Sequence, residues 1–158
     1  MKSRTQIILV KMMKTIFFAA FLILMTSACA QQPPEQPTLY ERLGEAEGIS
    51  AIVDDVVAAH MENPTIQAIF IPYKEQPERL AQIKAHLVDF FSAGSGGPAT
   101  YTGRDMPATH RCMNINATEY MAVMEDIMMV LDQHEIDGQS QKDVLFILWS
   151  LKGSIMGQ

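Results

Sequence analysis

One long irregular segment interrupts a chain that is otherwise patterned for helices. From Thr38 onward, apolar residues recur at helical spacing, and no strand-like alternation persists. This periodicity stops between Ser92 and Asn116 and then resumes. Loops of such length are uncommon inside compact domains and are usually functional. The sequence therefore predicts an all-α domain of four substantial helices, with a functional segment between the second helix and the third.

Local signals mark where the predicted helices begin and end. Asn63-Pro64 ends the first helix, and Pro77 lies in the first turn of the second. Asn116 and Glu119 have the spacing of a capping box before the third. The predicted helices span residues 48–61, 77–93, 117–131 and 144–155.

The first 28 residues have the layout of a secretory signal. Four basic residues precede a short apolar run at residues 16–25, and small residues follow it. This run is about half of the roughly 20 residues that a membrane-spanning helix needs. The tripeptide SAC at residues 27–29 resembles a bacterial lipobox, although Thr26 replaces the usual leucine, and ACA at residues 28–30 also fits ordinary cleavage. We expect cleavage before Cys29 and lipidation of that cysteine.

This processing predicts an exported domain on the periplasmic side, held to a bacterial membrane by its lipid anchor. Residues 29–37, rich in proline and glutamine, are predicted to form a polar linker. The folded domain is expected to span residues 38–157.

Charge and cysteine content exclude several classes of partner. Four of the 12 basic residues lie in the signal, which leaves eight against 18 acidic residues in the processed chain. Such an acidic chain repels nucleic acid and anionic lipid headgroups, so we exclude both as partners. Cys112 is the only internal thiol after processing, which excludes an intrachain disulfide.

The four histidines do not form a recognisable protein-only metal site. His60, His86, His110 and His134 lack zinc-type spacing, and no H-E-x-x-H motif is present. Haem iron is less demanding, because the porphyrin supplies four ligands and the protein needs to add one axial imidazole and an apolar cleft. The residues alone leave two interpretations open: a haem pocket, or a helical bundle with surface histidines.

Several stretches resemble a group I truncated haemoglobin, and the resemblance extends from about Thr38 to Ile155. It implies a shortened globin fold, two helices packed over two, with haem b between them. In that family the histidine that closes the pattern TGRDM-x-x-x-H is the proximal iron ligand, which here is His110. The stretches that carry the resemblance are TLYERLG (38–44), AIVDD (51–55), AHLVDFF (85–91) and GGPATYTGRDMPATH (96–110).

The resemblance also implies roles around the haem. The Nδ1–H group of His110 is expected to donate to a backbone carbonyl. Phe70 matches the family's phenylalanine on the haem face, and Tyr101 and Arg104 are expected to approach the propionates, with a surface salt bridge as the alternative for Arg104. We expect Gly96 and Gly97 to allow a close bend of the chain through positive φ angles.

The distal side departs from the family. Val57 and Leu87 stand where members that hold oxygen tightly commonly have tyrosine and glutamine, and Ile83 adds another apolar group. Without a donor, oxygen should leave faster and the ferrous haem should oxidise more readily, whereas NO and CO need the donor less. For His86 two roles remain open: a distal iron ligand, or a group at the haem edge.

The remaining departures concern residues outside the expected haem contacts. Glu45 follows Gly44 where the family has a second glycine, which puts the first tight turn in doubt. We expect His60 to be a partly buried structural residue, His134 to be solvated, and Cys112 to be a small buried hydrophobe.

Three functions are compatible with this reading. The first is reversible binding of O₂, NO or CO at a His-ligated haem. The second is an enzyme for NO dioxygenation or peroxide reduction that depends on an unidentified reductase. The third is an electron-transfer protein with bis-histidine ligation. The absence of C-x-x-C-H excludes c-type attachment of the haem.

Overall fold

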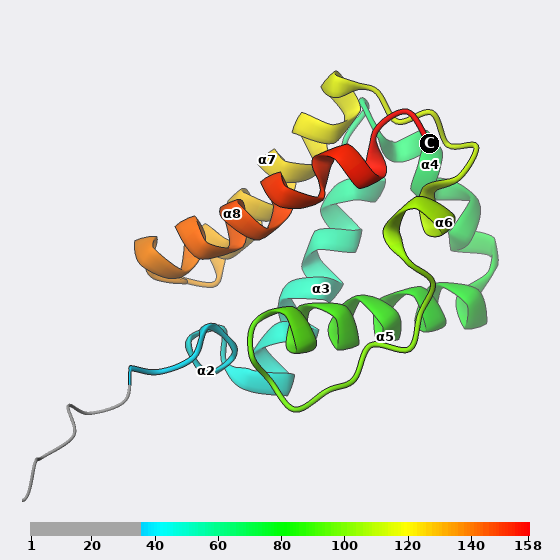
Figure 1. Ribbon diagram of the computed structural model, residues 1–158. Helices are drawn as coiled ribbons and strands as arrows, with labels where there is room; N and C mark the ends of the chain where they lie inside the picture. Colours follow the sequence, from blue (N-terminus) through cyan, green and yellow to red (C-terminus); the bar gives the residue numbers. More distant parts are fainter. Residues whose placement is uncertain (1–35) are drawn as a thin grey trace, which may run out of the picture. The chain divides into compact units, whose positions relative to one another are not determined.

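The computed structural model describes residues 36–158, of which Pro37–Gln158 form one compact unit (Figure 1). The expected signal, the lipidated Cys29 and nearly all of the linker lie outside the described residues. None of the helices in the described part of the chain is both long enough and apolar enough to cross a membrane.

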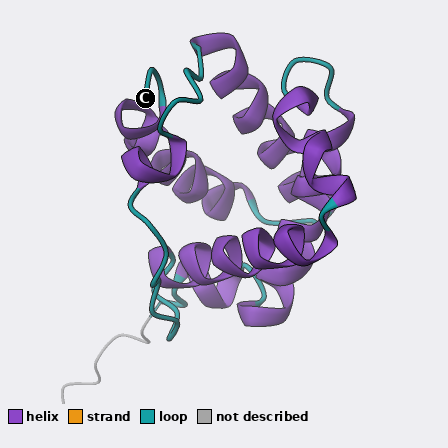
Figure 2. Ribbon diagram, turned by 90° about the vertical axis from the view of Figure 1, so that its right-hand side faces the viewer, coloured by secondary structure: helices purple, strands orange, loops and turns teal. Residues whose placement is uncertain are grey.

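Helices and their connections make up the described chain, and residues 36–158 contain no strand (Figure 2). The all-helical prediction is thus confirmed. The helices are α2 (Leu39–Arg42), α3 (Glu45–Glu62), α4 (Gln67–Phe70), the 3₁₀ helix η1 (Ile71–Glu75), α5 (Pro77–Gly94), α6 (Met106–His110), α7 (Ala117–Gln133) and α8 (Gly138–Ile155).

The four predicted helices correspond to α3, α5, α7 and α8, and two of them begin earlier than expected. Helix α8 starts at Gly138 because the Asp137 carboxylate caps it by accepting from the Gln139 and Ser140 amides. Its first turn is polar, so apolar periodicity alone does not detect it. The capping box of Asn116 and Glu119 at the start of α7 is present.

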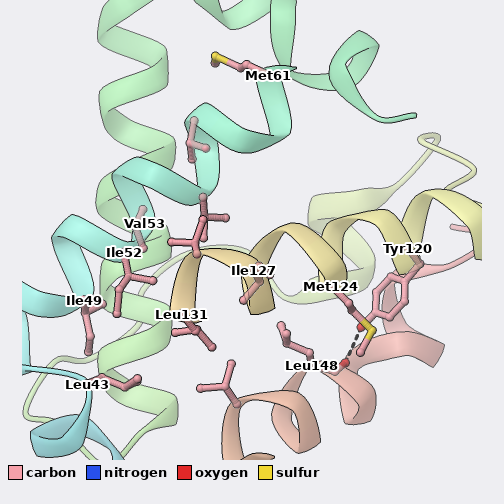
Figure 3. Close-up of a cluster of buried hydrophobic side chains, with 14 of the residues drawn as sticks. Leu43, Ile49, Ile52, Val53, Met61, Tyr120, Met124, Ile127, Leu131 and Leu148 are labelled. Atoms are coloured by element: carbon pink, nitrogen blue, oxygen red, sulfur yellow. Dashed lines mark hydrogen bonds between the residues drawn. The ribbon is translucent and has the colours of Figure 1, made fainter. Parts of the chain in front are cut away.

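Helix α3 lies at the centre of the packing. It contacts α5 on one side and α7 on another, and α7 packs in turn on α8. The buried core is formed mainly by α3, α7 and α8 (Figure 3). Each fully buried Leu, Ile or Val contributes about 1.5–3 kcal/mol. Tyr120 also joins two of these helices, because its hydroxyl donates to the Leu148 carbonyl oxygen. This core therefore holds the α7–α8 pair against α3 by packing of the chain's own side chains.

Two tight turns shape the ends of the domain. Gly44 has φ of +82° and Glu45 has φ of +58°, so the first turn forms with a non-glycine residue in the left-handed region. Gly96 has φ of +89°, as expected. The expectation of positive φ at Gly97 is wrong: a side chain there would collide with the Tyr40 ring and approach Ser92 Oγ to 2.6 Å. Gly97 is thus required for close approach rather than for its backbone angle.

Candidate functional site

A large, mostly apolar cavity of about 620 Å³ lies among the long helices and α6. Its volume falls within the range of about 300–1,000 Å³ that is usual for sites of small ligands and cofactors. The structure brings all of the site residues expected from the sequence to the lining of this one cavity: Val57, Phe70, Ile83, His86, Leu87, Tyr101, Arg104 and His110.

His110 is held in a defined orientation at the end of α6. Asp105 caps the start of this helix, because its carboxylate accepts from the Ala108 amide at 2.7 Å. His110 Nδ1 lies 2.8 Å from the Met106 carbonyl oxygen, so Nδ1–H donates to a backbone carbonyl as expected. In a neutral imidazole this leaves the lone pair on Nε2, which is the form that binds a metal. The half-buried His110 thus presents a free nitrogen ligand at the cavity wall.

Tyr101 organises one edge of the cavity. Its hydroxyl donates to the Arg104 backbone carbonyl at 2.8 Å. Its ring meets the rings of Phe90 and His86 edge-on, with centroid distances of 5.4 and 6.3 Å. His86 is exposed and rests against Tyr101. This placement favours the edge role for His86 over the role of a distal ligand.

The wall formed by α3 and α5 is apolar where the expected distal residues lie. Val57 is buried, and Ile83 and Leu87 are half-buried. Arg79 also lines the cavity, and its guanidinium donates to Gln82 Oε1 at 3.4 Å. Arg79 was not expected at the site, because a charged residue on an amphipathic helix usually faces the solvent.

A buried polar cluster interrupts the apolar lining. His60 is 4% exposed, lines the cavity and places Nδ1 2.8 Å from Asp126 Oδ2. Burial lowers the pKa of His60 below its ordinary value, and the hydrogen bond to Asp126 opposes that shift. Asn63 Nδ2 donates to the other Asp126 oxygen at 2.8 Å, and Phe70 packs on the imidazole with a centroid distance of 4.9 Å.

Asp126 was not identified from the sequence. It lies 66 residues from His60, so spacing gives no hint that the two side chains meet. The available signal is its place in the row Ala122–Asp126–Val130, because positions four apart share a helix face and both apolar neighbours are buried. A carboxylate in such a row requires a buried partner.

Two further expectations need correction. Cys112 is exposed rather than buried, since it follows α6 with φ of +65° and lies outside the cavity lining. His134 is partly buried rather than solvated, because its Nε2 lies 2.8 Å from Asp55 Oδ2 on α3. Within residues 36–158 no three His, Cys, Asp or Glu side chains gather as they would around a metal ion.

Two relatives with known names align with most of this chain. The group 1 truncated hemoglobin GlbN of Nostoc sp. (strain MUN 8820) is 24% identical over 121 residues, which cover 77% of this chain and 98% of that protein. The group 1 truncated hemoglobin GlbN of Mycolicibacterium paratuberculosis is 22% identical over 111 residues, which cover 70% of this chain and 78% of that protein.

Solved structures share the arrangement of helices. The truncated hemoglobin of Tetrahymena pyriformis, Fe(III) form, matches with a TM-score of 0.70 at 19% identity and covers 77% of this chain and 100% of its own. The group II truncated hemoglobin from Bacillus anthracis matches with a TM-score of 0.67 at 22% identity and covers 78% of this chain and 95% of its own. These likenesses confirm the two-over-two truncated-globin fold.

A family model described as bacterial-like globin matches residues 38–156, which include every cavity residue discussed above. The matched range also includes all of the helices described above, from Leu39 to Ile155. The chain belongs to the bacterial-like globin family.

Proposed function

We propose that this chain is a truncated haemoglobin that holds haem b in the cavity through His110 and reversibly binds O₂, NO or CO. The observation that carries the proposal is the hydrogen bond from His110 Nδ1 to the Met106 carbonyl oxygen. This hydrogen bond leaves Nε2 able to bind a metal at the wall of a mostly apolar cavity of about 620 Å³. The family match supports the same cofactor class.

The residues present fit a haem group. The apolar walls suit the porphyrin, and the guanidinium groups of Arg79 and Arg104 at the lining suit its two carboxylates. When bound, the haem supplies an iron atom that takes a diatomic ligand. The chain contributes the imidazole of His110, oriented by the Met106 carbonyl, and a mostly apolar lining.

The apolar positions Val57, Ile83 and Leu87 determine how a ligand is held. None of the three side chains can donate a hydrogen bond to a bound oxygen molecule. A hydrogen bond to a partly charged ligand contributes about 1.5–3 kcal/mol. We therefore expect faster release of oxygen than in relatives with distal donors, and a smaller difference for NO and CO.

The His110→Ala variant tests the proposal. The purified protein is titrated with hemin, and the absorption spectra of the ferric and ferrous forms are recorded. We expect wild type to take up one equivalent of hemin and His110→Ala to lose stable binding. His134→Ala is the matched control, because it removes a histidine outside the cavity lining. Tight, complete hemin binding by His110→Ala would refute the ligand assignment.

Export and anchoring are also part of the proposal and rest on the sequence of residues 1–29 alone. We propose that the domain lies on the periplasmic side of a bacterial membrane, tethered through lipidated Cys29. In cells, the full-length protein should partition with membranes and Cys29→Ser should not. Recovery of both proteins in the same fraction would remove the anchor from the proposal. The exposed position of His86 argues against the bis-histidine ligation of an electron-transfer role.

A further inference from the structure

A second imidazole, that of His60, faces the cavity from α3. Its Nδ1 is bound to Asp126, and no described residue forms a hydrogen bond with its Nε2. Among residues 36–158, every fully buried side-chain nitrogen or oxygen has a hydrogen-bond partner. Because His60 Nε2 has no such partner, this atom is not fully buried, and the open space beside His60 is the cavity. His110 reaches the same cavity from α6, so two imidazoles enter it from different helices.

The hydrogen bonds around Asp126 determine which His60 nitrogen carries the proton. The Thr65 amide donates to Asn63 Oδ1 at 3.0 Å, which turns Asn63 Nδ2 toward Asp126 Oδ1. A carboxylate oxygen only accepts, so His60 Nδ1 is the donor to Asp126 Oδ2. Burial lowers the pKa of His60 and so favours the neutral imidazole, in which the lone pair lies on Nε2. The group that His60 presents to the cavity is a hydrogen-bond acceptor.

A purely structural role gives this polar cluster little advantage over apolar side chains. Removing an imidazole and a carboxylate from water is costly, and well-packed apolar residues generally stabilise a helix contact as well or better. A second His–Asp contact joins Asp55 of α3 to His134, the residue directly after α7, and it lies near the surface and outside the cavity. The Asp55–His134 pair is a useful control, because it has the same two side-chain types as the Asp126–His60 pair but does not line the cavity.

We infer that His60, positioned by Asp126, is a hydrogen-bond acceptor of the haem cavity and favours small ligands that bring a proton, such as water or hydrogen peroxide, over ligands that only accept. This inference rests on the proposed function, because the ligand in question binds the haem iron. A hydrogen of such a ligand donates to Nε2, whereas the lone pair of Nε2 repels a ligand that offers only lone pairs.

The first test uses the ferric, hemin-loaded full-length protein and water as the ligand. Wild type should hold a water molecule on the iron, because the water donates to Nε2. His60→Leu should lose this ligand and show a five-coordinate ferric absorption and resonance Raman spectrum. His134→Leu, which removes the imidazole of the surface pair, should keep the wild-type spectrum.

The second test reverses the polarity of Nε2 with Asp126→Asn. An asparagine can keep its carbonyl oxygen toward Asn63 and turn its amide toward His60 Nδ1, so the proton of the neutral imidazole moves to Nε2. The imidazole then donates into the cavity. Fluoride, which only accepts, should bind the ferric protein about tenfold more tightly in Asp126→Asn than in wild type, a change of about 1.4 kcal/mol. His60→Leu should not show this gain.

A nitrogen-15 NMR spectrum of the ferrous CO form provides a check without mutation, and should report Nδ1–H and a bare Nε2 at His60. The inference is overturned if hemin binds normally but Nε2 carries the proton, or if water coordination and fluoride affinity are alike in wild type, His60→Leu and Asp126→Asn. Failure of wild type to bind hemin overturns the proposed function, and this inference with it.

Discussion

Helices α3 and α5 are each 18 residues long, yet α3 buries seven of its residues and α5 buries only Ser92. Both have an apolar stripe at helical spacing. The stripe of α3 lines the cavity but is also buried against α7 and the rest of the core, whereas the apolar side chains of α5, such as Leu80, Ile83 and Leu87, line the cavity and remain half-buried. The same sequence pattern thus gives a fully buried stripe in one helix and a half-buried cavity wall in the other.

This difference has an energetic meaning. Apolar surface stabilises a fold only when it is removed from water. Helix α3 gains that stabilisation from the chain itself, and α5 gains much of it when the cavity is filled. The α5 side should therefore open more readily than the α3 side in the haem-free protein.

The largest expected effect is a contrast between two alanine substitutions. Ile49→Ala removes a side chain that is 2% exposed and should lower the free energy of unfolding by about 2–5 kcal/mol. Ile83→Ala, on the cavity face of α5, should cost about 1 kcal/mol in the haem-free protein, since little packing is lost. Urea denaturation of both variants measures the contrast. Equal losses would show that α5 is as fully packed as α3.

Addition of hemin should stabilise α5 more than α3, with an effect on stability somewhat smaller than that of Ile49→Ala. A ligand that binds only the folded state adds about 2.7 kcal/mol at a free concentration one hundred times its dissociation constant. We expect this gain to appear in hydrogen exchange as slower exchange of the α5 amides, with little change along α3. A uniform slowing of both helices would mean that the domain opens only as a whole.

The smallest effect concerns pH and the start of α8. Neither α3 nor α5 has a side-chain cap, whereas hydrogen bonds from the Ser140 hydroxyl and amide hold the pKa of Asp137 below its usual value. The charged carboxylate is therefore favoured in the folded state, so its stabilisation is full above the unfolded pKa and disappears as pH falls through the lowered one. Asp137→Ala should be less stable near neutral pH, and the difference should vanish in acid. A difference that persists after full protonation would contradict this origin.

Features of the structure that depend on local patterns could be predicted from the sequence. The α3 stripe, the capping box of Asn116 and the histidine that ends TGRDMPATH were all identified from residues close together in the chain. These features depend on helical spacing and on a motif, both of which are local.

The remainder depends on contacts that spacing does not reveal. His60 and Asp126 become a cavity feature only when α3 and α7 are packed together. Gly97 owes its role to the Tyr40 ring, and Cys112 is exposed because the chain leaves α6 in a left-handed turn. For His60, Asp126 and Gly97 the deciding contact comes from an element far away in the sequence, and no window along the sequence contains that information.

The docking of Gly97 against Tyr40 has a consequence for the proximal side. The Tyr40 amide also donates to the Ser95 carbonyl at 3.0 Å, so the short helix α2 fastens the point where the segment toward His110 begins. The start of the segment that leads to His110, the proposed haem ligand, is thus held by the N-terminal end of the domain. Substitutions in α2 should therefore change the position of the His110 imidazole even though α2 lies far from it in the sequence.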